Sequence, residues 1–227
     1  MFDVALSPYK SVYYPQDAFL SLCQYNLLEH WRTGRQSTGY ATTPFYVLLK
    51  LTTAVTLDYA QYQGQTLQNG VNQWLSVRFA APPTGKLRFS APQPPLNESS
   101  IQDATKEGAL CVSANNVEGL QFGSARQPMA EDCLFMGIYA PANATEDSKL
   151  PIMFFIQGGG FTSNSNGNFN GTGLVERSGM NMMVVRINYR VGILGFIAGT
   201  AVSNDKNGAV PNNGLNDSKY LILFSSR

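Results

Sequence analysis

Two apolar runs in the second half of the chain give the clearest structural signals. The first covers residues 150–156 and ends in three glycines, and the second lies within residues 180–189. A short apolar run bounded by turn residues is typical of a strand that is buried on both faces of a sheet. The sequence therefore predicts two buried strands, joined by a loop over the Asn-, Gly- and Ser-rich residues 161–173.

Shorter extended pieces and turn signals precede these runs. Asn69-Gly70 is a strong hairpin signal. Residues 78–95 are rich in proline, which excludes a regular helix and predicts an irregular segment along the surface. Residues 131–141 predict a strand that ends at a proline, whereas residues 1–55 show no clear period.

Composition narrows the class of protein. The 227 residues suit one large domain or two small ones, and 44% of them are hydrophobic, which is enough for a core. Charged residues make up 14%, against roughly 25% in ordinary soluble domains, and the polar residues are mostly Asn, Ser, Thr, Gln and Gly. This composition is compatible with a secreted protein. A net charge of +1 without long runs of like charge excludes nucleic acid as a partner.

The cysteines do not form a metal-binding pattern. Cys23, Cys111 and Cys133 include no Cys-x-x-Cys pair, and His30 is the one histidine of the chain. Zinc sites need four closely placed Cys, His or carboxylate ligands, so neither a metal nor any other cofactor is expected.

Two features bear on secretion. Asn97, Asn143 and Asn170 head sequons that accept glycans in the secretory pathway, and Asn216 heads a fourth match. Residues 1–10 do not resemble a signal peptide, but residues 45–57 match the short apolar region of one. The same segment can equally be an ordinary first strand or helix. No transmembrane segment is expected, because this run is too short to span a bilayer.

The three glycines after residue 156 suggest chemistry. Glycine lets the backbone turn sharply and brings unobstructed N–H groups close to a ligand. A strand that runs into such a loop builds one wall of an esterase oxyanion hole. The alternative is a plain flexible turn. The serine on a Gly-x-Ser-x-Gly elbow that would complete this chemistry is absent from the 227 residues.

Five short motifs follow one another between residues 78 and 217. They are Arg78-Phe-Ala-Ala-Pro-Pro-Thr-Gly-Lys-Leu-Arg-Phe89, Glu131-Asp-Cys-Leu134, Gln157-Gly-Gly-Gly-Phe161, Asn188-Tyr-Arg190 with Gly195-Phe196, and Asn213-Gly-Leu-Asn-Asp217. In this order and spacing they resemble the type B carboxylesterase family, which includes cholinesterases and secreted fungal esterases and lipases. The resemblance implies an α/β-hydrolase fold with a central, mostly parallel sheet, incomplete in this chain.

The resemblance also implies roles for particular residues. Gly159 and Gly160 would donate backbone N–H groups to the oxyanion, and Gln157, where the family usually has His or Tyr, would tune the site rather than abolish it. Cys111 and Cys133 match a family disulfide, the alternative being two separate reduced thiols. Two ion pairs are expected to be buried, unless they are ordinary surface charges: Arg88 with Glu131, and Arg190 with Asp217.

The resemblance divides the chain into three parts. Residues 1–55 are unmatched, residues 56–217 form the N-terminal part of the esterase domain, and residues 218–227 are a tail outside the family pattern. The family's serine, histidine and glutamate belong beyond Asp217, and His30 lies too far upstream to act as the base. The chain is therefore expected to be a truncated and inactive copy of an enzyme that acts on small-molecule or lipid esters. It is also expected to be poorly soluble or unstable, because the strands at 150–156 and 180–189 would have unpaired edges. The alternatives are a non-catalytic, adhesion-like binding protein on the same fold and a genuine short product.

Overall fold

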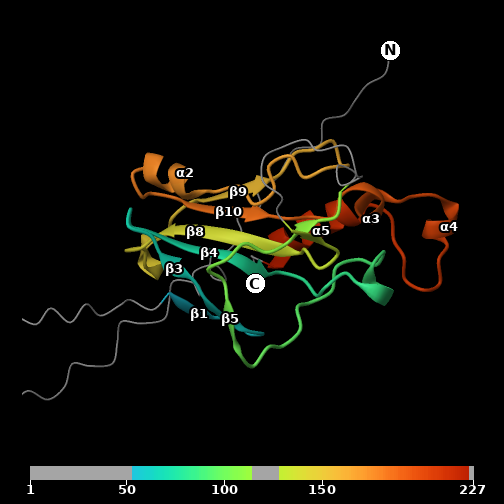
Figure 1. Ribbon diagram of the computed structural model, residues 1–227, viewed down its shortest axis with the longest axis horizontal. Helices are drawn as coiled ribbons and strands as arrows, with labels where there is room; N and C mark the ends of the chain where they lie inside the picture. Colours follow the sequence, from blue (N-terminus) through green and yellow to red (C-terminus); the bar gives the residue numbers. More distant parts are fainter. Residues whose placement is uncertain (1–52, 114–127, 225–227) are drawn as a thin grey trace, which may run out of the picture.

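The computed structural model describes residues 53–113 and 128–224 (Figure 1). Cys23, His30 and most of the signal-peptide candidate at 45–57 lie outside the described residues. The last part of that candidate forms strand β1 (Ala54–Thr56). Within the described residues, no helix has the length and apolar character needed to cross a membrane.

A five-stranded sheet forms the centre of the described chain (Figure 1). Its strands, from one edge to the other, are β3 (Gln65–Thr66), β4 (Val71–Arg78), β8 (Phe135–Pro141), β10 (Met183–Ile187) and β9 (Ile152–Ile156). The β3–β4 pair is the hairpin that Asn69-Gly70 predicts, with Gly70 at a φ of 78°. Among the neighbouring pairs of this sheet, β9 and β10 run parallel and the others run antiparallel.

Two smaller sheets flank the main one. One contains β1, β2 (Gln61–Gln63) and β5 (Ile101–Asp103), and the other pairs β6 (Leu110–Cys111) with β7 (Met129–Ala130). Between β4 and β5 the proline-rich segment is irregular except for a short 3-10 helix, η1 (Gly85–Leu87). A second such turn, η3 (Glu146–Ser148), precedes β9.

Helices lie toward the two ends of the sheet (Figure 1). Helix α2 (Thr172–Arg177) is in the crossover that makes β9 and β10 parallel, and it contacts β4, β8 and β10. Helices α3 (Gly192–Phe196), α4 (Thr200–Ser203) and α5 (Asn213–Phe224) follow β10, and α3 packs against α5. The chain thus has helices and a mixed sheet, consistent with part of an α/β fold. The described sheet differs from the mostly parallel one expected, because three of its four strand pairs are antiparallel.

The core is divided between the two faces of the sheet. The larger cluster includes Trp74, Phe79, Leu134, Ile138 and Leu221, the last from α5. The smaller cluster lies under α2 and joins Val175 to residues of β4, β8 and β10: Val71, Leu75, Tyr139 and Val184. Alternate residues of β4, β8 and β10 point to the two faces, so both clusters depend on these strands.

Strand β9 departs from its sequence prediction. Its apolar run predicts burial on both faces, but Met153 is 40% and Ile156 is 47% exposed. Strand β10, with a similar composition, is buried at every position. The difference arises because β10 has neighbours on both sides, whereas β9 is the last strand of the described sheet.

A buried arginine in β10 leaves no room for a side chain at the facing position of β8, which is occupied by glycine. The side chain of Arg186 is 1% exposed and donates to the carbonyl of Leu75 at 2.9 Å, to Asn168 and to Glu107. Burial raises the pKa of Glu107, an effect that the nearby Arg186 guanidinium opposes. Gly137 lies opposite Arg186 in the sheet, and a Cβ placed there would come within 2.5 Å of Arg186 Nε.

Substituting Gly137 by alanine should therefore destabilise the chain. Overpacking a buried site costs about 2 kcal/mol, because the guanidinium or the strand must move. Gly173→Ala is the matched control, since a Cβ at that position in α2 has no atom within 4 Å. It should leave stability unchanged or raise it by about 0.5–1 kcal/mol through helix propensity. Urea unfolding followed by tryptophan fluorescence measures both; equal midpoints for the two variants would contradict the assignment.

Candidate active site

The glycine loop starts where β9 ends. Gly159 and Gly160 have φ values of 137° and 59°, in the region that favours glycine. A Cβ on Gly159 would lie 1.9 Å from the carbonyl oxygen of Ser163, so the loop closes too tightly for any side chain there. The sharp turn depends on glycine at this position.

The loop is held by its carbonyl groups. The carbonyl of Gly159 accepts hydrogen bonds from the N–H groups of Thr162 and Ser163, both at 3.1 Å, and the Phe161 carbonyl accepts one from Gly192 at 2.7 Å. Within the part of the chain that the structure describes, no oxygen accepts a hydrogen bond from the N–H of Gly159 or Gly160. Two adjacent donors are therefore available on a fixed turn, with Gly160 exposed and Gly159 partly exposed.

Apolar side chains surround the loop. The rings of Phe161 and Phe196 lie 4.9 Å apart, which joins the loop to α3. Phe161 is 57% exposed, and Ile193, next to the glycine that bonds to the loop, is 69% exposed. Phe161 and Ile193 thus expose apolar surface on the loop and on the helix that bonds to it.

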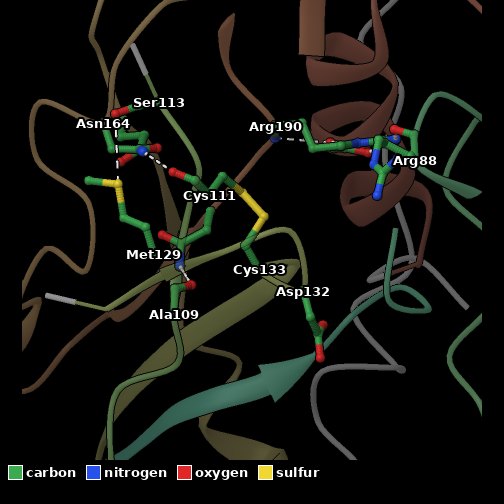
Figure 2. Close-up of a disulfide and its surroundings, with 12 residues drawn as sticks. Arg88, Ala109, Cys111, Ser113, Met129, Asp132, Cys133, Asn164 and Arg190 are labelled. Atoms are coloured by element: carbon green, nitrogen blue, oxygen red, sulfur yellow. Dashed lines mark hydrogen bonds and ion pairs between the residues drawn. A yellow bond between two sulfur atoms is a disulfide. The ribbon is translucent and has the colours of Figure 1, made fainter. Parts of the chain in front are cut away.

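A disulfide joins Cys111 in β6 to Cys133, with an S–S distance of 2.02 Å, and both residues are buried (Figure 2). This is the pairing that the family resemblance implies. Cys111 lies close to the glycine loop, as shown by the hydrogen bond that Asn164 Nδ2 donates to its carbonyl at 2.6 Å. Gln157, directly before the glycines, is 2% exposed and donates in turn to Asn164 Oδ1. Sequence analysis missed this role of Asn164, since nothing distinguishes it from the other asparagines of the loop.

The Arg190–Asp217 pair is buried, as expected. The two side chains are 2% and 0% exposed, and Arg190 bonds to Asp217 through Nη2 at 2.7 Å, Nε at 2.9 Å and its backbone N–H at 3.0 Å. Burial raises the pKa of Asp217, and these three bonds act against that effect. Arg190 Nη1 also donates to the carbonyls of Arg88 and Ser90, at 3.2 and 2.9 Å.

The structure corrects the expectation for the other pair. Arg88 Nε lies 2.9 Å from Glu131, but the side chains are 44% and 31% exposed, so the pair is not buried. Sequence analysis also missed the Arg78–Asp132 pair: the two side chains bond at 2.6 Å, and the Arg78 guanidinium lies 4.5 Å from the centre of the Phe135 ring. Its signal was Asp132, the acidic neighbour of Glu131, which lies three residues before β8, the strand that pairs with β4.

The remaining site predictions fall on the surface. Asn97, Asn143 and Asn170 are all exposed, which leaves room for a glycan at each. Asn170 Oδ1 accepts a hydrogen bond from the N–H of Thr172. No group of three or more His, Cys, Asp or Glu side chains that could hold a metal ion occurs among residues 53–113 and 128–224.

Breaking the buried pair should be costly. Asp217→Asn leaves the buried Arg190 charge without its carboxylate, which costs about 3–5 kcal/mol. Glu131→Gln is the matched control, because half-exposed pairs contribute only about 0–1 kcal/mol. Chemical unfolding of the two variants tests the difference, and a smaller loss for Asp217→Asn than for Glu131→Gln would contradict it.

The comparisons with known proteins agree with this geometry. A family model described as the carboxylesterase family matches residues 52–218. Pyrethroid hydrolase Ces2e from Rattus norvegicus is 40% identical over 136 residues, which cover 58% of this chain and 24% of that relative.

Solved structures extend the likeness to the fold. EstA from Aspergillus niger is similar with a TM-score of 0.68 and 39% identity, over 76% of this chain and 32% of that one. A thermophylic PNB esterase follows with a TM-score of 0.65 and 29% identity, over 75% of this chain and 34% of that one. The chain thus spans a quarter to a third of the length of these relatives. It has part of the α/β-hydrolase fold and belongs to the carboxylesterase family.

Proposed function

We propose that this chain supplies the oxyanion-binding part of a serine carboxylesterase. The observation that carries the proposal is the turn after β9, which leaves the N–H groups of Gly159 and Gly160 unbonded within the described chain. Membership of the carboxylesterase family supports the same reaction class, hydrolysis of a carboxylic ester.

The chemistry follows from where charge develops. When a nucleophile attacks an ester carbonyl, the oxygen becomes negatively charged, and N–H donors aimed at it stabilise the transition state. Removing one such donor typically costs about 3–4 kcal/mol in activation free energy. The turn fixes Gly159 and Gly160 before the reaction begins, so little free energy is needed to orient them.

The surroundings favour an uncharged, partly apolar substrate. Phe161 directly follows the glycines and Ile193 directly follows the residue that bonds to the Phe161 carbonyl, and both side chains expose apolar surface. We propose a small-molecule or lipid ester as the substrate class. The pyrethroid hydrolase similarity fits this class without selecting a particular ester.

The proposed activity belongs to a polypeptide that also carries a serine nucleophile and a histidine base. These 227 residues contain no Gly-x-Ser-x-Gly elbow, and their one histidine is His30. Without a nucleophile, an oxyanion hole has no intermediate to stabilise. We propose further that the protein is secreted and glycosylated, because exposed Asn97 and Asn143 head sequons and Cys111 is disulfide-bonded.

The purified 227-residue chain should not hydrolyse esters. Incubated with p-nitrophenyl butyrate, it should release p-nitrophenol at the rate of buffer alone, with no initial burst. Ester hydrolysis that persists after a second, orthogonal purification step would contradict the proposal that these 227 residues lack the nucleophile.

The role of the glycines is tested in a polypeptide that includes the nucleophile. Complementary DNA that continues this reading frame beyond the codon for Asp217 would provide it. In that polypeptide, Gly159→Ala should lower kcat about 100- to 1000-fold with little change in KM. The loop must open to admit the methyl group, so its N–H donors no longer point at the oxyanion. Gly173→Ala should leave kcat unchanged. Absence of esterase activity in that polypeptide, or equal kcat in both variants, would contradict the proposal.

A further inference from the structure

We infer that Gln157 and Asn164 are positioning residues that fasten the glycine loop to the disulfide-bonded strand β6. The functional meaning of this fastening rests on the proposed function, because it matters for catalysis only if the loop binds an oxyanion. The fastening itself is a property of the loop and can be measured without any activity.

The two side chains form a relay between the loop and β6. Gln157 Nε2 donates to Asn164 Oδ1, and Asn164 Nδ2 donates to the Cys111 carbonyl at 2.6 Å. Figure 2 shows the Asn164 amide directed at that carbonyl beside the disulfide. At the other end, the Tyr189 hydroxyl donates to the Gln157 carbonyl at 2.8 Å, and burial raises the pKa of Tyr189, so the hydroxyl keeps its proton at neutral pH.

The relay lies where it can restrict the conformations of the loop. Gln157 immediately precedes the glycines and Asn164 follows Ser163, so their side-chain bond closes the base of the six-residue segment 158–163. Closing a short segment at its base removes most of the conformations open to it. The backbone bonds inside the segment, from Thr162 and Ser163 to Gly159, then form within a fixed frame.

The amide of Asn164 suits both bonds of this relay. Asn164 must accept from Gln157 and donate to the Cys111 carbonyl at the same time, which an amide does with its two ends. An aspartate would keep the acceptor but set a carboxylate oxygen against the carbonyl. The fit around Gln157 is close, since a Cβ on Gly167 would lie 3.0 Å from Gln157 Oε1.

The disulfide is the fixed end of the relay. Cys111 and Cys133 are each 1% exposed, and their bond holds β6 next to the start of β8. The position of the Cys111 carbonyl, and through Asn164 that of the loop, therefore depends on the disulfide. Reduction of the Cys111–Cys133 bond should loosen the glycine loop before it disturbs the central sheet.

Amide hydrogen exchange, resolved by residue with NMR on the full 227-residue chain, tests the relay. The reporting amides are those of Thr162, Ser163 and Ser165, which are bonded inside the loop, and the reference amides are those of β10. Asn164→Ala and Asn164→Asp should each accelerate exchange of the reporters about tenfold, the effect of losing one or two net hydrogen bonds. Exposed Asn166, which has no side-chain bond in the described chain, gives the control Asn166→Ala, with no acceleration.

Reduction supplies the second arm. In the unsubstituted chain, dithiothreitol should accelerate exchange of the reporter amides while the β10 amides remain protected. In Asn164→Ala it should cause no further acceleration, because the bond between the loop and β6 is already absent. Equal exchange in Asn164→Ala and Asn166→Ala would overturn the proposal. So would parallel acceleration of β10, which would mark a general loss of stability. Neither result depends on esterase activity, so loss of the proposed function would leave this test intact.

Discussion

The buried bond between Arg190 and Asp217 is the constraint on which the site depends. It joins the end of β10 to helix α5, and Arg190 also bonds to the carbonyls of Arg88 and Ser90 in the irregular segment. The backbone is crowded at this point: a Cβ on Gly195 or Gly214 would lie 2.1 or 2.5 Å from the Arg190 carbonyl. Three segments far apart in sequence therefore meet at one buried charge, and displacing any of them would remove part of the set of bonds that the Arg190 guanidinium makes.

Two sets of contacts hold the glycine loop, one near Arg190 and one near the disulfide. On the side of Arg190, the N–H of Gly192 bonds to the Phe161 carbonyl, and the Phe161 ring contacts Phe196 of α3. On the other side, Asn164 bonds to the strand that carries the disulfide. A loop built from glycines has little stiffness of its own. Its order comes from these two anchors, and within the described chain the N–H groups of Gly159 and Gly160 stay without a hydrogen-bond acceptor.

Local sequence patterns predicted the main strands and the hairpin but not helices α2 to α5. The surroundings of each element depended on contacts that local patterns do not contain. The apolar runs located β9 and β10, Asn69-Gly70 located the hairpin, and the triple glycine located the candidate site. The exposure of β9 was missed because an edge strand and a central strand can share one composition. The half-exposed Arg88, the contact between Gly137 and Arg186, and the Asn164 relay each join residues more than forty positions apart, and only the fold brings them together.

The most direct test of the central claim is the response of two amides to a tetrahedral oxyanion. In the polypeptide that includes the nucleophile, the serine would attack the phosphorus of a p-nitrophenyl alkylphosphonate monoester and release p-nitrophenolate. A negatively charged tetrahedral phosphonate would remain on the serine. The account predicts that the amide protons of Gly159 and Gly160 then shift downfield in ¹⁵N-edited NMR spectra, while that of Gly173 does not move. Unchanged shifts for both loop glycines in a fully labelled sample would contradict the claim that they bind the oxyanion.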